Sequence, residues 1–202
     1  MHSTNHIVKF TDDTTVVGLI STNNERAQSD HFPLFTDGFP VEIVKSTKFL
    51  GVHLVKNFTW SLNTSSISKK GQKRLYFLRR LRKAHLPPPI LTMFYRGTIE
   101  SVLSSCITAW FRNCTISDRK SLQRIVKTAE KIIGVSLPSI TDMYTKRCIR
   151  KANSIVDDPT HPSHTLFTLM PSGKRYRSIW ALTTSLCNSF FPQAIRLLNT
   201  QN

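Results

Sequence analysis

Acidic residues are scarce in this sequence, and their scarcity is uneven. The 202 residues include 12 Asp and Glu against 28 Lys and Arg, which gives a formal net charge of +16. No acid stands between residues 61 and 99, and the whole positive excess lies within residues 61–202. A charge of this size favours polyanionic partners, with nucleic acid the most common and acidic membrane surfaces second. The alternative is a basic domain whose charge serves only solubility.

Long apolar runs and cysteine motifs are also missing. No run approaches the roughly 20 residues that a membrane-spanning helix needs, so we expect no membrane association. Residues 1–10 lack the apolar core of a signal peptide, so we expect an intracellular protein, nuclear or cytoplasmic, that is not secreted. The four cysteines form no C-x-x-C pair, which argues against a zinc site and a disulfide framework. We expect reduced thiols in or near the core.

The first 60 residues predict two β-hairpins. Residues 7–10 and 14–20 are rich in β-branched side chains and flank turn-forming residues at 11–13. Residues 41–44 and 48–54 predict a second hairpin that turns near Ser46-Thr47, and the polar stretch 21–40 predicts a loop.

From residue 61 onward the apolar period is that of helices. Residues 61–83 carry apolar side chains on one side and basic ones on the other, and 88–111 predicts one central core helix that buries Cys106 and Trp110. Further helices are predicted from an N-cap at Ser117 to residue 133, over 140–156, near 178–188 and after Pro192. Between them, a short hairpin is expected through 171–173. The predicted fold class is α+β: two N-terminal β-hairpins followed by a mainly α-helical basic region.

Asp12 and Asp13 are paired carboxylates on the predicted tight turn between two strands. Adjacent acids repel each other, and polymerases use such a pair to hold Mg²⁺ ions that activate a 3′-hydroxyl and stabilise the leaving pyrophosphate. The simpler interpretation is that Asp-Asp is a good hairpin turn.

The residues around this pair resemble a reverse transcriptase. Residues 9–15, KFTDDTT, resemble the aromatic-X-Asp-Asp motif of LINE-type non-LTR retrotransposons, and residues 48–52, KFLGV, resemble the primer-grip hairpin that follows it. Residues 60–110 resemble the thumb and early post-thumb region of LINE polyproteins from fish, and the similarity continues through 124–134 to 169–173. The resemblance implies a partial palm with primer grip over 1–60, thumb-like helices over 61–116 and a helical post-thumb region over 117–202.

The departures from that family bear on catalysis. A LINE polymerase needs a third catalytic Asp upstream of the Asp-Asp turn, and only eleven residues precede Asp12 here. Several dozen residues that the family carries between the two hairpins are reduced to 21–40. We therefore expect a truncated, non-catalytic remnant in which Asp12 and Asp13 are vestigial catalytic residues and a weak Mg²⁺ site. No other cofactor is expected.

A second resemblance lies within the same stretch. Residues 122–164 resemble the segment assigned to the N-terminal domain of AlkB-homologue proteins, which modify tRNA with a 2-oxoglutarate dioxygenase and a methyltransferase. None of the seven histidines has an acid two residues later, as the Fe(II) site of a dioxygenase requires, and no GxGxxG motif is present for a methyl donor. The resemblance implies a link to alkylation repair without the residues for either activity.

The basic residues form the main candidate site. A thumb-like helix could follow a phosphate backbone with one face, giving non-specific binding of RNA or an RNA–DNA duplex. A solvated basic face is the alternative. The candidate nucleic-acid-binding residues are Lys69, Lys70, Lys73, Arg79, Arg80, Lys83, Arg175 and Arg177.

Two other groups of residues are candidates for a functional role. Asp157, Asp158, His161 and His164 could hold a metal, but the prolines among them favour a capped turn. Trp60 and Trp180 could either stack on bases or pack against other side chains of the protein.

Overall fold

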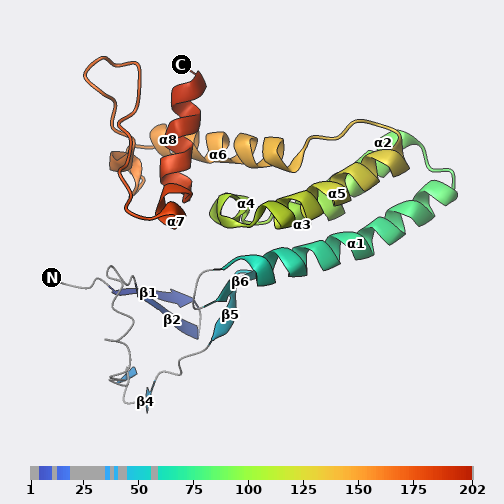
Figure 1. Cartoon of the computed structure of the whole chain (residues 1–202), viewed down its shortest axis with the longest axis horizontal. Helices are drawn as coiled ribbons and strands as arrows, with labels where there is room; N and C mark the ends of the chain where they lie inside the picture. The colour runs from blue at the N-terminus through green and yellow to red at the C-terminus, as the bar shows by residue number, and fades with distance from the viewer. Residues whose placement is uncertain are drawn as a thin grey trace. The chain divides into compact units, whose positions relative to one another are not determined.

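Short β-hairpins precede a mainly helical region, so the protein belongs to the α+β class as predicted (Figure 1). The computed structural model describes residues 5–10, 13–18, 35–36, 39–40, 45–55 and 59–201, with side chains described over 45–55 and 59–201. The chain divides into two compact units, Met1–Ile43 and Val44–Asn202. The second hairpin therefore belongs to the unit that contains the helices.

The first unit contains the first predicted hairpin. Strand β1 (Asn5–Phe10) pairs antiparallel with β2 (Asp13–Gly18), with Phe10 opposite Asp13. Part of the predicted loop 21–40 is in fact paired, since β3 (Phe35–Thr36) pairs with β4 (Phe39–Pro40). The residues between them in the sequence, Asp37-Gly38, form a dipeptide that strongly favours a two-residue hairpin connection. The loop prediction overlooked this signal.

The second hairpin forms, but its turn is not where the sequence predicted it. Strand β5 (Ser46–Phe49) pairs with β6 (Val52–Val55), so the chain turns at Leu50-Gly51 and not at Ser46-Thr47. Both turn residues have positive φ, +47° at Leu50 and +82° at Gly51. Two consecutive positive φ angles are typical of a type I′ turn, and Gly51 accepts this conformation without a Cβ penalty. The expected partner strand, 41–44, lies outside the described residues.

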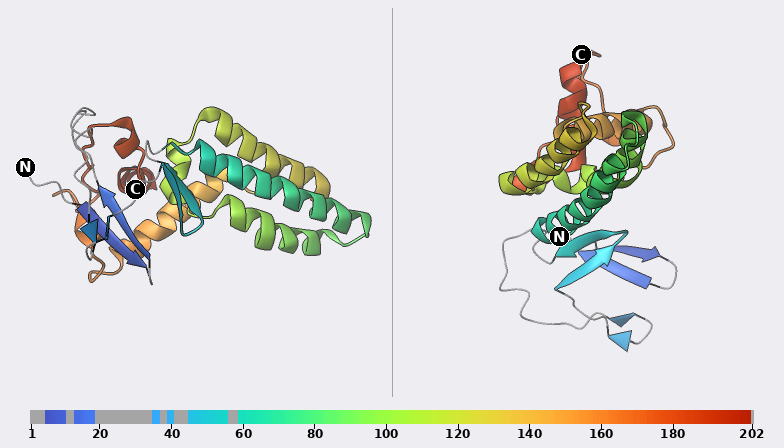
Figure 2. Two further views of the ribbon diagram at one scale, coloured as in Figure 1. Left: turned by 90° about the horizontal axis from the view of Figure 1, so that it is seen from below. Right: turned by 90° about the vertical axis from the view of Figure 1, so that its right-hand side faces the viewer.

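Helix α1 (Ser61–Lys83) begins at the predicted residue and has the predicted division into two faces. Ile67, Leu75 and Leu78 are buried, and Gly71 lies between them on the same face. A Cβ added at Gly71 would lie 3.1 Å from Cδ1 of Ile125. Gly71 thus allows α1 to pack closely along α5 (Ile116–Ile133), as Figures 1 and 2 show.

The predicted core helix over 88–111 is broken into short pieces. They are α2 (Pro88–Phe94), the π-helical turn η2 (Tyr95–Glu100), α3 (Ser101–Leu103), α4 (Ile107–Trp110) and the 3₁₀ turn η3 (Phe111–Asn113). Cys106 has φ +48° and is exposed, so the prediction of a buried Cys106 was wrong. The hydroxyls of Thr98, Ser101 and Ser104 each donate to the carbonyl four residues earlier. Such back-bonding weakens a helix, and α3 ends at Leu103, directly before the last of the three.

The next two helices end where sequence signals place them, but one begins earlier than predicted. Helix α5 is capped by Thr115, whose hydroxyl accepts from the backbone N–H of Asp118, and not by Ser117. The reciprocal bond from Thr115 N–H to the Asp118 carboxylate completes a capping box, a pairing that requires three-residue spacing. Gly134 follows α5 with φ +83°, as predicted. Helix α6 (Ile140–Val156) has the predicted bounds.

The C-terminal region packs on the end of α6. The expected helix near 178–188 is limited to α7 (Thr184–Cys187), and α8 (Phe190–Gln201) begins two residues before Pro192. The predicted hairpin through 171–173 is a single bridge between Leu169 and Tyr176. Ala152 and Ile155 of α6 join Ala194, Ile195 and Leu198 of α8 in a small apolar cluster.

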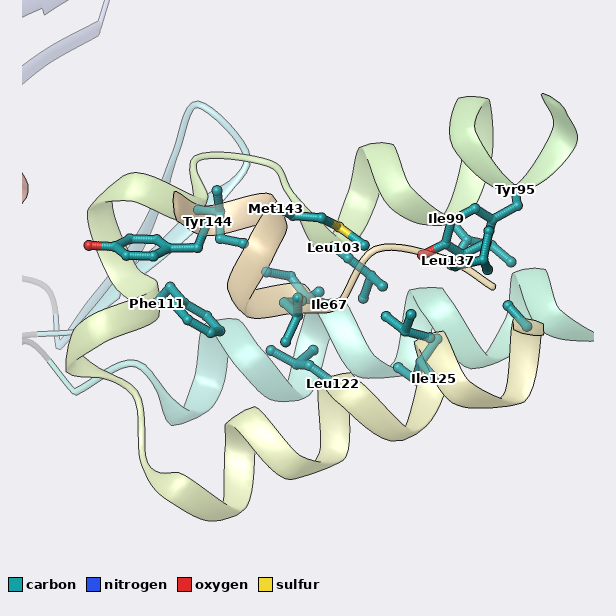
Figure 3. Packing of buried hydrophobic residues seen from close by; sticks show 14 of the residues in the cluster. Ile67, Tyr95, Ile99, Leu103, Phe111, Leu122, Ile125, Leu137, Met143 and Tyr144 are labelled. Carbon is teal, nitrogen blue, oxygen red and sulfur yellow. The ribbon is translucent and has the colours of Figure 1, made fainter. Parts of the chain in front are cut away.

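A larger core holds the remaining helices together. Figure 3 shows side chains of α1, residues 91–111, α5 and the start of α6 meeting in it, together with Leu137 from the loop between α5 and α6. Trp110 is completely buried, as predicted, and so is Tyr95. Trp60 packs against the edge of this core, whereas Trp180 is 81% exposed. The core therefore fixes which face of α1 remains outside.

Candidate nucleic-acid interface

The outer face of α1 gathers six of the eight candidate basic residues. All six side chains are exposed and project from one uninterrupted helix. They are Lys69, Lys70, Lys73, Arg79, Arg80 and Lys83. At 1.5 Å per residue, the segment 69–83 is about 21 Å long, comparable with roughly six base-pair steps of a duplex.

Two aromatic rings stand among these cations. Tyr76 and Phe77 are each 54% exposed, and their ring centroids lie 5.6 Å apart in an edge-to-face arrangement. The guanidinium carbon of Arg80 lies 5.9 Å from the centroid of the Tyr76 ring, one helical turn away. This combination of cations and exposed rings could contact phosphates and bases together.

Sequence reasoning did not assign Tyr76 and Phe77 to the site. The signal was present, because Leu75 and Leu78 already occupy the buried face of α1. Residues adjacent in a helix point about 100° apart, so the two aromatics between these leucines must lie towards solvent.

Arg74 has a different role from its basic neighbours on α1. It is half-buried, and its guanidinium donates a hydrogen bond to the carbonyl oxygen of Thr98 in η2. Arg74 thus fastens α1 to the π-helical turn. It also helps define one side of a groove between these elements.

The remaining two candidate residues lie on another element. Arg175 and Arg177 are exposed on the segment that follows η4 (His164–Leu166). The backbone of Tyr176 between them exchanges two hydrogen bonds with the side chain of Asn199 in α8, at 2.8 and 3.0 Å. They therefore belong to the surface of the smaller apolar cluster and not to the face of α1.

The proposed magnesium ligands lie largely outside the described residues. Asp13 begins β2, where its backbone lies opposite Phe10, but its side chain and all of Asp12 are outside the described part. The Mg²⁺ site therefore stays a prediction from the sequence.

The Asp–His cluster after α6 is a capped turn, as predicted. The carboxylate of Asp158 accepts from both the N–H and the hydroxyl of Thr160, at 3.0 and 2.6 Å. These bonds lower the pKa of Asp158. The Nδ1 atom of His161 accepts from the Ser163 N–H, and that of His164 lies 3.1 Å from the Ile155 carbonyl. Over the described ranges, no three His, Cys, Asp or Glu side chains are placed to share a metal ion.

The most strongly shifted pKa values belong to core residues. Burial raises the pKa of Tyr95 and Tyr144 well above the usual tyrosine range, and raises that of Cys114 to about 11. Burial also raises the pKa of Cys148. All four side chains lie in the main core, so these shifts reflect packing. Cys114 and Cys148 are buried and Cys187 is half-buried, as expected of core or near-core thiols.

Comparison with known proteins gives one partial match. The family model described as "Alkylated DNA repair protein alkB homolog 8, N-terminal" matches residues 60–101. The matched stretch covers α1, α2 and η2, so it lies N-terminal to residues 122–164, where the sequence resemblance had placed it. It contains the six exposed basic residues of α1. No curated protein and no solved structure matches the chain.

No helix of the described residues is long and apolar enough to cross a bilayer.

Proposed function

We propose that this protein binds nucleic acid through the outer face of α1, without reading its sequence. The ligand is RNA or an RNA–DNA duplex, as in the thumb region that residues 60–110 resemble. The single observation that carries the proposal is the uninterrupted basic face of α1, with two exposed aromatic rings among its six cations.

The charge distribution supports a polyanion as the ligand. The positive excess lies in residues 61–202, and the sequence holds no acid from 61 to 99 that could neutralise α1. Lysine and arginine contacts to phosphates release condensed counterions, so affinity should fall steeply with salt. Phosphates are alike along a strand, so such contacts carry no sequence information.

The partial family match is compatible with this ligand class. The matched protein is named for the repair of alkylated DNA, so its own substrate class is a nucleic acid. The match falls on the same helix that carries the basic face. The reverse-transcriptase resemblance, made independently from motif order, implies the same class of ligand.

A second candidate function follows from the same match. The chain is then a segment of an alkylation-repair system with dioxygenase and methyltransferase steps, although its sequence has the usual motif of neither. Residues 60–101 are the part that supports this candidate. Binding of Fe(II) with 2-oxoglutarate, or of S-adenosylmethionine, by the purified chain would favour it over simple backbone binding.

The test is fluorescence anisotropy with a labelled RNA–DNA primer-template at several salt concentrations. The variant Lys73→Glu/Arg80→Glu reverses two exposed charges seven residues apart on α1. We expect at least about tenfold weaker binding at low salt, and a plot of log affinity against log salt that is less steep by about 2.

A matched control is available on α5. Lys120→Glu/Lys127→Glu changes the net charge equally, with the same seven-residue spacing between exposed side chains. We expect the control to retain most of the affinity. An equal loss in both variants, or no binding by the folded wild type at low salt, would contradict the proposed interface.

A further inference from the structure

A groove lies between α1 and the helical segment that packs beside it, residues 94–105. The groove opens at the surface and has a volume of about 750 Å³. Arg74, Phe77 and Arg80 line it from α1, and Gly97, Ser101 and Val102 line it from η2 and α3.

The walls of this groove combine apolar and cationic groups. Phe77 is 54% exposed, Phe94 is half-buried, and both line the groove together with the exposed Arg80. Arg74 closes one side through its hydrogen bond to the Thr98 carbonyl. The lining includes two guanidinium groups and no carboxylate, so the groove favours a ligand that carries both an apolar ring and a negative charge.

Gly97 marks the open side of the groove. A Cβ added at Gly97 would meet no atom within 4 Å, whereas a Cβ at Gly71 would lie 3.1 Å from Ile125. Packing therefore favours a glycine at position 71 but gives no reason for one at position 97. Glycine is unfavourable inside a helix, and π-helical turns such as η2 are frequent at functional sites. A ligand that approaches the backbone closely would account for the glycine.

We propose that this groove receives an unpaired base of a single-stranded segment, with the base against Phe77 and a neighbouring phosphate at Arg80. This inference rests on the proposed function, because Arg80 also belongs to the basic face of α1. A paired base within a duplex cannot offer its ring to a side chain, whereas an unpaired one can stack on an aromatic ring. The groove thus adds a preference for unpaired nucleotides to backbone binding.

The test compares three labelled probes: a short oligouridylate, the same strand without bases, and a blunt RNA–DNA duplex. We expect the wild type to bind the oligouridylate about fivefold or more tightly than the abasic strand. Gly97→Leu should abolish this preference by filling the groove, and Gly97→Ala should reduce it. Gly97→Ala should not lower the melting temperature, because its added Cβ meets no atom within 4 Å.

Two exposed apolar side chains supply a matched pair of variants. Phe77→Ala should remove the preference for bases, while Met93→Ala, at a side chain that is 72% exposed but not part of the groove lining, should preserve it. The reverse pattern, or equal wild-type affinity for normal and abasic strands, would overturn the groove while leaving backbone binding intact. If the wild type binds none of the three probes, the proposed function fails as well.

Discussion

Helix α1 and residues 88–113 follow each other in the chain and pack in the same core, yet their backbones differ. Helix α1 continues for 23 residues without interruption, although it contains Gly71. Residues 88–113 pass through a π-helical turn, a left-handed residue at Cys106 and a 3₁₀ turn. Continuity therefore does not depend on apolar period alone. Hydroxyl side chains that bond back to the helix, and the contacts available to each turn, also determine where a helix ends.

The largest expected effect concerns the reactivity of the cysteine thiols. It tests directly whether the helix is interrupted at Cys106. Cys106 is exposed, whereas Cys148 is fully buried. Burial also raises the pKa of Cys148, which leaves little of the reactive thiolate near neutral pH. With a thiol-reactive dye at pH 8, Cys106 should react about a thousandfold or more faster than Cys148, whose modification requires unfolding.

The variant Cys106→Ser is the control for this measurement. It should remove the fast phase and leave the slow reaction of the buried thiols unchanged. With the half-buried Cys187 also replaced by serine, a fast phase that persists after Cys106→Ser, or one that is missing while Cys106 is present, would contradict the exposed position of Cys106.

A smaller effect is expected from the buried face of α1. Leu78 has no exposed surface, so Leu78→Ala should lower the free energy of unfolding by about 2–5 kcal/mol. Leu62→Ala, on the same helix but 46% exposed, should change it by only about 0.5 kcal/mol. Urea unfolding measures both values. Similar decreases in the free energy of unfolding for the two variants would contradict the assignment of the buried and exposed faces of α1.

The sequence predicts helices well where period and end signals agree. Helix α6 has its predicted bounds because its apolar period lies between a capping serine, Ser139, and the turn-forming Asp157-Asp158. The N-cap of α5 was misplaced because Ser117 and Thr115 are both capping residues, and only the spacing to Asp118 distinguishes them. The turn at Leu50-Gly51 was missed because the apolar run 48–54 reads as one strand.

The candidate site likewise has one part that the sequence predicts and one part that it does not. The exposed basic residues of α1 were predictable, because periodicity places them opposite Leu75 and Leu78. The groove beside Phe77 was not, because it forms only where α1 packs against η2. Its shape depends on the π-helical turn and on the hydrogen bond from Arg74 to the Thr98 carbonyl, neither of which has a sequence signature.

The smallest expected effect concerns the left-handed residue itself. Cys106 has φ +48° and ψ 28°, a conformation that costs most residues with a Cβ roughly 1 kcal/mol and costs glycine little. Cys106→Gly should therefore raise the free energy of unfolding by about 0.5 kcal/mol, after the greater freedom of glycine in the unfolded chain is counted. Ala109→Gly, at an exposed position in α4, should lower it by about 0.5–1 kcal/mol. If the free energy of unfolding rises in Cys106→Gly and falls in Ala109→Gly, the helix is interrupted at Cys106. If it falls in both variants, Cys106 is helical.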